Sequence, residues 1–209
     1  GGLEETRYVY LAGNHLPQRW QNQPHFTIIE TGFGTGLNFL ATWQAWQSDP
    51  QRCQHLHYIS IEKHPIPRSQ LAQLLHWEEL QPFRDELLSQ YPALILGTHI
   101  LHLAQGRITL SLCFEDIETA LNELNTPANA WYLDGFAPTR NTEMWSLPTL
   151  QRIAQLSHPQ ATLATFSAAG QVRRHLEAAQ FQVQKRKGFG IKREMITASI
   201  ITPPDRPNP

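Results

Sequence analysis

A glycine loop directly follows a short β-branched run in the stretch FTIIETGFGTGLNFL, and this arrangement leaves few folds open to the chain. The run from Phe26 to Glu30 predicts a buried strand. The apolar stripe from Gly36 to Gln47 predicts a helix. A strand, a glycine turn and a helix in this order favour an open α/β sheet, in which ligands bind at the carboxyl ends of the strands.

Strand-like and helical segments alternate along the rest of the chain. The stretch THILHLAQGRITLSLCF contains two strand-like runs split by a short turn, which predicts a hairpin. We expect other strands at 56–62, 130–133, 162–166, 181–186 and 194–201, and helices at 67–75, 82–90, 116–124, 149–156 and 168–179. This alternation predicts an α/β fold with a mostly parallel sheet, helices on both faces and an antiparallel strand pair at the C-terminal end.

Length and composition limit the classes of protein to which the chain can belong. A chain of 209 residues with 41% apolar residues can bury one core, so we expect a single domain over 1–201 and a proline-rich tail or linker at 202–209. The net charge of −1 excludes a global attraction to nucleic acid and leaves room only for a local patch. Two cysteines, scattered histidines and no apolar run of about 20 residues indicate a reduced cytoplasmic protein with no metal site and no membrane partner.

The spacing of the glycines indicates which ligand the loop holds. A dinucleotide fingerprint needs G-x-G-x-x-G, but after Gly32 and Gly34 the third glycine is Gly36, and the Gly-Lys-Ser/Thr of a Walker loop is absent from the sequence here. The pattern is instead E-x-G-x-G-x-G, in which Glu30 would repel a pyrophosphate and attract a cation. S-adenosyl-L-methionine is such a ligand, because it carries a sulfonium and an ammonium group.

Two further carboxylates follow later strands. Glu62 ends the second strand, where a side chain can accept hydrogen bonds from two ribose hydroxyls, and Asp116 follows the third parallel strand, where it suits an adenine amino group. The alternative is a tight glycine turn with solvated acids at the strand ends, which three acids in register on successive strands disfavour. We therefore assign to a cofactor site Glu30, Gly32, Gly34, Gly36, Asn38, Glu62, Lys63, Asp116 and Ile117.

Four motifs in order, ETGFGTGLNFL, YISIEKHP, WYLDGFAP and KGFGIKRE, make the chain resemble the methyltransferase domain of the MnmC family, from GLEETRYVYLAGN to about Ile201. The resemblance implies a Rossmann-like, class I S-adenosyl-L-methionine-dependent methyltransferase. It implies methylation of the 5-aminomethyl group of (2-thio)uridine at the wobble position of tRNA, giving 5-methylaminomethyl-2-thiouridine. It also implies a partner, an FAD-dependent oxidase domain, fused or separate.

The resemblance further implies that Arg7 and Asn14 line the substrate cleft. Because the family's usual sequence starts further upstream, we expect an N-terminally truncated fragment. Two departures from the family are SHPQATLAT, where a Pro-Gly-Gly turn is usual, and FED in place of Gly-Asp before the adenine site. The stretch SHPQATLAT does not predict the conformation of the loop that it forms. The FED stretch still contains Asp116 before the predicted adenine site.

The segment WYLDGFAPTRN holds the candidate catalytic residue. Methyl transfer to an amine needs alignment of donor and acceptor, with no acid at the leaving sulfur. Asp134 follows the fourth strand, next to the bound methyl in this topology, so we expect it to orient the amine first and to accept its proton second. Gly135 permits the turn, while Phe136 offers an aromatic face and Pro138 stiffens the loop at the substrate site.

One segment near the C-terminal end is strongly basic, although the net charge of the whole chain is close to zero. We call residues 173–193 the basic segment. It contains one acid, Glu177, and seven of the 17 basic residues of the chain: Arg173, Arg174, Lys185, Arg186, Lys187, Lys192 and Arg193. Phe189, Lys192 and Arg193 are candidates for contact with a splayed wobble base and with phosphates of tRNA. The alternative is a solvated hairpin whose charges protect a sheet edge.

Three functions remain open at this point. The leading one is a tRNA wobble-uridine N-methyltransferase. A small-molecule amine methyltransferase would share Glu30, Glu62 and Asp134 and would not need the basic segment. A non-catalytic RNA-binding module would bind no cofactor and would tolerate Asp134→Ala.

Overall fold

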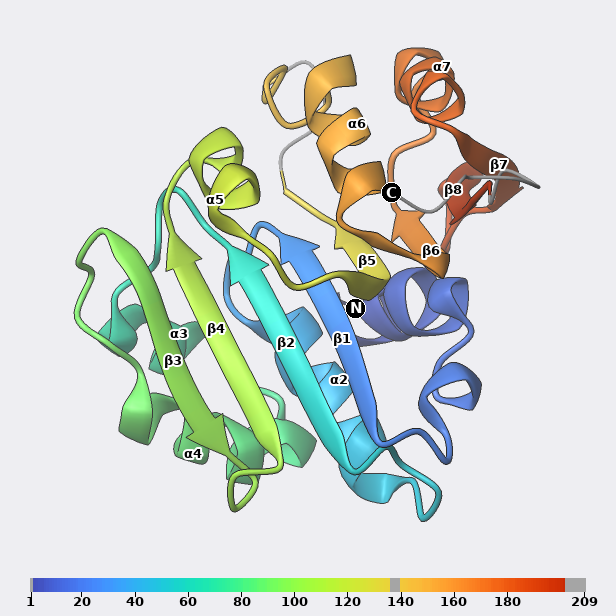
Figure 1. Cartoon of the computed structure of the whole chain (residues 1–209). Coiled ribbons are helices and arrows are strands. Elements are labelled where there is room, and N and C mark those ends of the chain that lie inside the picture. The colour runs from blue at the N-terminus through green and yellow to red at the C-terminus, as the bar shows by residue number, and fades with distance from the viewer. Residues whose placement is uncertain (1, 136–139, 202–209) are drawn as a thin grey trace.

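The computed structural model describes residues 2–135 and 140–201, in which eight strands form one sheet of order β3-β4-β2-β1-β5-β6-β8-β7 (Figure 1). The middle of the sheet is parallel and consists of β4 (Ile108–Phe114), β2 (His55–Ile61), β1 (His25–Thr31), β5 (Ala128–Leu133) and β6 (Ser157–Thr165). Antiparallel pairing completes both edges, with β3 (Gly97–Leu103) on β4, β8 (Glu194–Ile200) on β6, and β7 (Phe181–Lys187) on β8. The predicted mostly parallel sheet with an antiparallel C-terminal pair is confirmed.

Helices cover both faces of the sheet (Figure 1). One face carries α2 (Leu37–Ser48), α3 (Arg68–Leu74), the short turn η4 (Glu78–Leu80) and α4 (Gln81–Gln90). The other face carries α5 (Ile117–Glu123), α6 (Leu147–Gln155) and α7 (Gly170–Ala178). Within the described ranges, no helix has the length and apolar character needed to cross a membrane.

The central strands are buried on both faces, because successive side chains of a strand point to opposite sides. Ile28 of β1 belongs to the core under α2, whereas its neighbour Ile29 belongs to the core under α6. Tyr58 and Ile59 of β2 divide between the two cores in the same way. Apolar runs therefore mark these strands in the sequence, as is typical of a parallel sheet.

Most predicted elements have the predicted type, and the predicted hairpin is β3 and β4, joined by a turn in which Ala104 and Gln105 have positive φ angles. One strand differs from the prediction. β6 begins at Ser157, where a loop was expected, because Ser157 pairs with Ala128 of β5 before a register shift ahead of Ala130. This first half of β6 is polar and lacks the apolar pattern by which a strand is recognised.

The chain begins with a run of short helical turns for which the sequence predicted no element: α1 (Gly2–Thr6), η1 (Arg7–Leu11), η2 (Ala12–Asn14) and η3 (Gln18–Trp20). We call residues 2–14 the N-terminal helical segment. Its α1 packs against α2, and its η1 and η2 pack against β6. Turns of three to five residues are too short to show a helical period, which is why the sequence pattern did not reveal them.

Candidate active site

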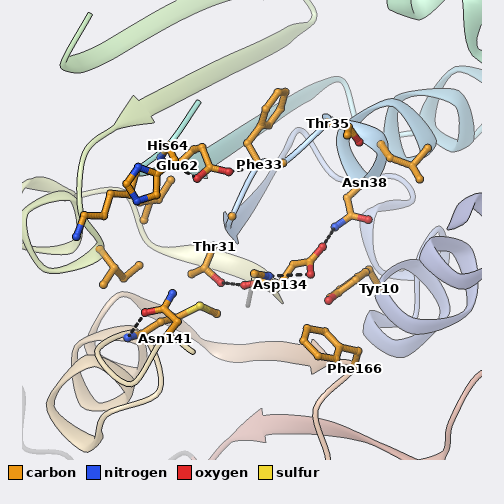
Figure 2. Close-up of a pocket in the computed structure, with 18 of the residues that line it drawn as sticks. Tyr10, Thr31, Phe33, Thr35, Asn38, Glu62, His64, Asp134, Asn141 and Phe166 are labelled. Atoms are coloured by element: carbon orange, nitrogen blue, oxygen red, sulfur yellow. Dashed lines mark hydrogen bonds between the residues drawn. The ribbon is translucent and has the colours of Figure 1, made fainter. Parts of the chain in front are cut away.

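A cavity of about 700 Å³ opens at the carboxyl ends of β1, β2 and β5 (Figure 2). Its walls come from the glycine loop, from residues that follow β2, β4, β5 and β6, and from the N-terminal helical segment. Small-molecule sites have volumes of this order, and in open α/β sheets they lie at this end of the strands. The cavity is therefore the candidate active site.

The glycine loop forms one wall of the cavity through Gly32 and Gly34, whereas Gly36 is the N-cap of α2 and does not line it; the three glycines have positive φ angles of 89°, 54° and 84°. A Cβ at Gly32 would lie 3.1 Å from the Cα of Gly135, and a Cβ at Gly36 would lie 2.8 Å from the ring of Phe33. A Cβ at Gly34 would meet nothing within 4 Å, so the tip of the loop faces open space. Glycines at these positions let the backbone turn tightly and let a ligand approach it closely.

Glu62 follows β2 and lines the same cavity. Its Oε1 accepts a hydrogen bond from the Gly34 N–H at 2.9 Å, and its Oε2 accepts one from the His64 N–H at 3.1 Å. Because a carboxylate oxygen has two lone pairs, each oxygen keeps one for a ligand hydroxyl. Lys63 and Ile117 also line the cavity, so the structure brings these predicted cofactor residues together around the glycine loop.

Asp116 does not line the cavity, in contrast to the prediction. It is the N-cap of α5, and its carboxylate accepts hydrogen bonds from the N–H and the hydroxyl of Thr119, each at 2.9 Å. These bonds lower its pKa. A carboxylate directly before a helix is drawn to the free N–H groups of the first turn. Its neighbours Glu115 and Ile117 line the cavity instead.

Asp134 follows β5 and lies on the cavity wall beside Asn38 and Tyr10 (Figure 2). Its Oδ1 accepts a hydrogen bond from the Gly135 N–H at 2.7 Å, and its Oδ2 accepts one from Asn38 Nδ2 at 2.8 Å. Burial raises the pKa of this carboxyl. A raised pKa makes the carboxylate a better proton acceptor than an exposed aspartate.

Glu30 lies behind this wall, where its side chain is fully buried. It accepts hydrogen bonds from Ser60 Oγ at 2.7 Å and from Asn38 Nδ2 at 2.9 Å. Burial, followed by the charge of Asp134, raises the pKa of Glu30 to about 8. We predicted a carboxylate that meets the cation directly; the structure corrects this to an acid that is mostly protonated at neutral pH and contacts Asn38, which itself lines the cavity.

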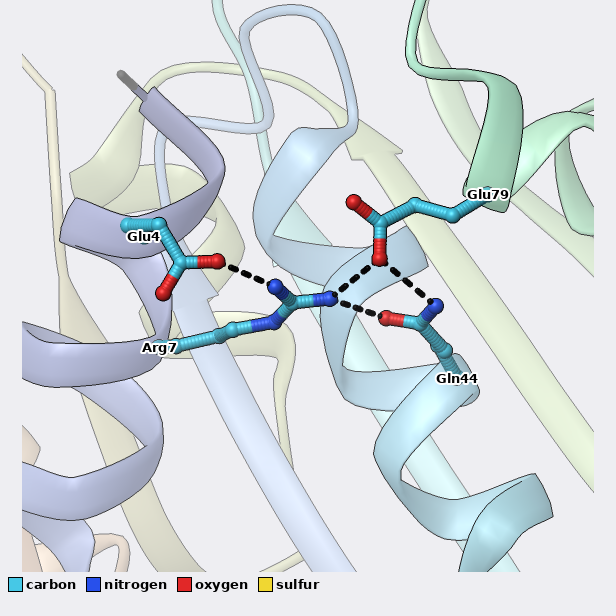
Figure 3. Close-up of polar contacts among 4 residues, drawn as sticks. All are labelled: Glu4, Arg7, Gln44 and Glu79. Atoms are coloured by element: carbon cyan, nitrogen blue, oxygen red, sulfur yellow. Dashed lines mark hydrogen bonds and ion pairs between the residues drawn. The ribbon is translucent and has the colours of Figure 1, made fainter.

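Arg7 and Asn14 do not line this cavity, in contrast to the place in the substrate cleft that the resemblance implied. Arg7 belongs to a surface network in which it donates hydrogen bonds to Glu4, to Gln44 at 2.6 Å and to Glu79 at 2.9 Å (Figure 3). Asn14 is fully buried, and its amide donates to backbone carbonyls of η1 and β5 at 3.0 and 3.2 Å. Both side chains instead fasten the N-terminal helical segment to the rest of the fold.

Among the described residues of the basic segment, Lys192 is the one that lines the cavity. Its ammonium forms an ion pair with Glu5 of α1. The same Nζ lies 5.7 Å from the centre of the Phe166 ring. Lys192 therefore bridges the loop between β7 and β8 and the N-terminal helical segment at the cavity.

The other predicted substrate residues have different surroundings. Phe189 is half-buried and contacts Tyr8, with ring centroids 5.8 Å apart, whereas Arg193 is exposed. Phe136 and Pro138 lie outside the described residues. Their predicted contacts with substrate stay predictions.

Sequence reasoning missed the residues that the N-terminal helical segment and the end of β6 contribute. Thr6 donates a hydrogen bond to Asn38 Oδ1 at 2.8 Å, and Tyr10 and Phe166 flank the space beside Asp134 (Figure 2). Phe166 follows a parallel strand at the ligand-binding end of the sheet, which is a signal that sequence can supply. In the described part of the chain, no group of three or more His, Cys, Asp or Glu residues is placed to hold a metal ion.

Comparisons with known sequences identify the family and its relatives. The family of S-adenosyl-L-methionine-dependent methyltransferases matches residues 78–201. The tRNA 5-methylaminomethyl-2-thiouridine biosynthesis bifunctional protein MnmC of Aromatoleum aromaticum is 51% identical over 196 residues, covering 93% of this chain and 31% of that protein. The protein of the same name from Azoarcus sp. is 47% identical over 211 residues, covering 100% of this chain and 33% of that protein. The chain spans about a third of the length of these curated relatives.

Solved structures share the fold. The crystal structure of MNMC2 from Aquifex aeolicus matches with a TM-score of 0.76 at 24% identity and covers 99% of this chain and 64% of that chain. Spermidine synthase from Thermotoga maritima matches with a TM-score of 0.55 at 8% identity and covers 94% of this chain and 59% of that chain. Together with the family match, the first likeness confirms the predicted Rossmann-like methyltransferase fold.

Proposed function

Because the chain belongs to the family of S-adenosyl-L-methionine-dependent methyltransferases, we propose that it methylates the 5-aminomethyl group of (2-thio)uridine at the wobble position of tRNA. The relatives that are about half identical to it carry the name of a tRNA 5-methylaminomethyl-2-thiouridine biosynthesis protein, which supports this substrate. The observation that carries the proposal is Asp134, held by two hydrogen bonds on a cavity wall beside the glycine loop.

The residues around the cavity fit S-adenosyl-L-methionine. The open tip at Gly34 leaves room for a ligand against bare backbone, and Glu62 has lone pairs free for two ribose hydroxyls. Lys63 and Ile117 complete this side of the proposed cofactor site. When bound there, the cofactor supplies an electrophilic methyl group on a sulfonium.

Asp134 prepares the acceptor amine in this proposal. An alkylammonium has a pKa of roughly 10, as in lysine, so the amine arrives protonated at neutral pH. The Asp134 carboxylate attracts this ammonium, holds its nitrogen on the cavity wall and accepts its proton. The raised pKa of Asp134 brings its proton affinity closer to that of the amine. Tyr10 and Phe166 exclude water on the flanks of the site and offer aromatic faces to the cation.

The basic segment is the proposed contact for tRNA. Lys192 lines the cavity, and Arg186, Lys187 and Arg193 are exposed in the same segment. Such a local patch binds phosphates even where the net charge of the chain is near zero. A tRNA substrate places the activity in the cytoplasm, and an FAD-dependent oxidase, fused or separate, is the proposed partner that prepares the amine.

The test is methyl transfer to tRNA that carries unmethylated 5-aminomethyl-2-thiouridine, with the nucleosides identified by mass spectrometry. Asp134→Ala is expected to lower turnover by at least about 100-fold, the usual range for a positioned acid or base. Its affinity for S-adenosylhomocysteine, measured by calorimetry, is expected to stay within about threefold of wild type. Asp85→Ala, which removes an exposed acid on α4, is the matched control.

Three other outcomes would each reject a part of this proposal. Wild-type turnover in Asp134→Ala would remove Asp134 from the mechanism. Methylation of free amines without methylation of tRNA would replace the substrate class by small-molecule amines. Binding of tRNA without binding of S-adenosylhomocysteine would replace the enzyme by an RNA-binding module.

A further inference from the structure

A buried polar cluster lies directly behind Asp134 and is centred on the Asn38 side chain. Asn38 Nδ2 donates one hydrogen bond to Glu30 at 2.9 Å and one to Asp134 at 2.8 Å. Asn38 Oδ1 accepts a hydrogen bond from Thr6 Oγ1 at 2.8 Å. On its far side Glu30 accepts a further bond from Ser60 Oγ at 2.7 Å. One amide thus joins two carboxyl groups from β1 and from the end of β5.

The orientation of this amide is determined by its partners. A carboxamide has donors on one side only, so a half-turn about its last bond would point Oδ1 at both carboxyl groups and Nδ2 at the Thr6 hydroxyl. Glu30 lies in the interior and is fully buried, so its contact with Asn38 is not exchanged with water. An unmatched polar contact at such depth costs about 1–3 kcal/mol. The ionised Asp134 carboxylate only accepts hydrogen bonds, so it fixes Nδ2 on its side, and the Glu30 acceptor and the Thr6 hydroxyl then hold the amide in this orientation.

We propose that Glu30 is a positioning residue for methyl transfer, which acts through Asn38 to hold the Asp134 carboxylate in place without touching substrate or cofactor. This inference rests on the proposed function, because it assigns Asp134 to the acceptor amine. The functional part of Glu30 is its hydrogen-bond acceptor, since Asn38 Nδ2 needs an oxygen at that position. A charge at Glu30 is not needed for this role.

The protonation of Glu30 supports the same role. The titratable groups that face Glu30 are Asp134 and the phenols of Tyr10, Tyr58 and Tyr132. Burial and Asp134 raise its pKa to about 8, so it is mostly neutral at pH 7. A neutral acid still accepts from Asn38, and it does not place a second negative charge next to Asp134.

Two substitutions at Glu30 separate its acceptor from its charge. Glu30→Gln keeps an oxygen for Asn38 and turns its amide N–H toward Ser60 Oγ, which can accept it. Glu30→Ala removes the acceptor. We expect Glu30→Ala to lower kcat at least about tenfold with KM for tRNA and affinity for S-adenosylhomocysteine nearly unchanged, whereas Glu30→Gln recovers most of kcat. Asp49→Ala, which removes another buried, hydrogen-bonded carboxylate remote from Asn38, is the control for a loss of kcat through destabilisation alone.

A double-mutant cycle tests whether Glu30 acts through Asn38. If it does, Glu30→Ala adds little to the loss of kcat in Asn38→Ala. Additive losses would overturn the proposal, and so would a Glu30→Gln protein as slow as Glu30→Ala. Where Glu30→Ala does not fold, Glu30→Met makes the same test, because it removes the acceptor for Asn38 and largely keeps the side-chain volume. Unchanged kcat in Glu30→Met would then overturn the positioning role.

A second readout needs no substrate and separates this inference from the proposed function. The side-chain NH₂ pair of Asn38 is assigned in ¹H–¹⁵N NMR spectra by its absence in Asn38→Asp. We expect this pair to be shifted and protected from exchange in wild type and in Glu30→Gln, and to lose both features in Glu30→Ala. A pair that is unaffected by Glu30→Ala overturns the inference even if tRNA methylation is confirmed. A pair that behaves as expected in a chain without methyltransferase activity rejects the proposed function and retains the contact.

Discussion

Gly32 and Gly135 bring two strand-end loops into direct contact, since a Cβ added at Gly32 would lie 3.1 Å from the Cα of Gly135. The contact arises because β1 and β5 are neighbours in the sheet, so the residues after each strand meet at its carboxyl end. The glycine loop and the loop of Asp134 therefore share one boundary. Cofactor and acceptor residues of the proposed site are held in register by this contact.

Gly32→Ala is expected to disturb both loops. Its φ of 89° strains any residue with a Cβ, by about 1–2 kcal/mol, and the added methyl group meets the Gly135 backbone. Gly34→Ala is the control, because its φ is also positive but its Cβ meets nothing. We expect Gly32→Ala to lower the melting temperature of the ligand-free protein more than Gly34→Ala does. Equal effects in the two variants would contradict a role for the contact.

Glu62→Gln is expected to weaken binding of S-adenosylhomocysteine by roughly 10- to 100-fold. Glutamine keeps an acceptor for the Gly34 N–H but loses the charge that strengthens hydrogen bonds from ligand hydroxyls. Calorimetric titration of wild type and variant measures the change. Glu118→Gln on α5 serves as the control, and an unchanged dissociation constant in Glu62→Gln would remove Glu62 from the cofactor site.

Asp116→Ala is expected to act on stability more than on ligand affinity. The carboxylate caps α5, and loss of an N-cap costs about 1 kcal/mol. Urea unfolding measures this loss, which Asp116→Asn largely restores. A drop in S-adenosylhomocysteine affinity as large as that of Glu62→Gln would instead support the adenine contact that the sequence predicted.

Glu30 is expected to make stability depend on pH. Its pKa rises from an ordinary 4.5 in the unfolded chain to about 8 in the folded one, so the folded state holds the proton more tightly. The stabilisation is full below pH 4.5 and is lost as the pH rises to about 8. We expect the free energy of unfolding to fall by a few kcal/mol more in wild type than in Glu30→Gln over this window. Parallel curves for the two proteins would show that Glu30 ionises normally.

Binding of tRNA is expected to weaken steeply with salt. If the basic segment contacts several phosphates, affinity falls by more than about tenfold between 50 and 200 mM salt. Charge reversal in Arg186→Glu and Lys187→Glu lowers both the affinity and this slope. Arg107→Glu, in the turn between β3 and β4 at the opposite edge of the sheet, is the control. A flat salt dependence would argue against phosphate contacts.

Much of the fold could be predicted because its signals are local. The strand before the glycine loop, the helix after it and the β3–β4 hairpin each show their pattern within a few neighbouring residues. The position of Glu62 and Asp134 at one edge of the sheet could be predicted in the same way, since both directly follow neighbouring parallel strands. The first half of β6 could not be predicted, because its polar residues pair with β5 without an apolar pattern.

The polar contacts of the site could not be predicted from local patterns. Asn38 joins Thr6, Glu30 and Asp134 across separations of 32, 8 and 96 residues, and no local pattern encodes which side chains meet. Arg7 shows the same limit, because its partner Glu79 lies 72 residues away on the surface.

The parallel sheet, the glycine loop and the end of the sheet where the cavity opens could be predicted from the sequence, because hydrophobic period and glycine spacing are patterns of neighbouring residues. Three features became visible only in the folded chain: Glu30 is a buried partner of Asn38, Asp116 caps a helix, and the N-terminal helical segment lines the cavity. Those outcomes depend on burial and on hydrogen bonds between distant segments, which exist only once the chain has folded.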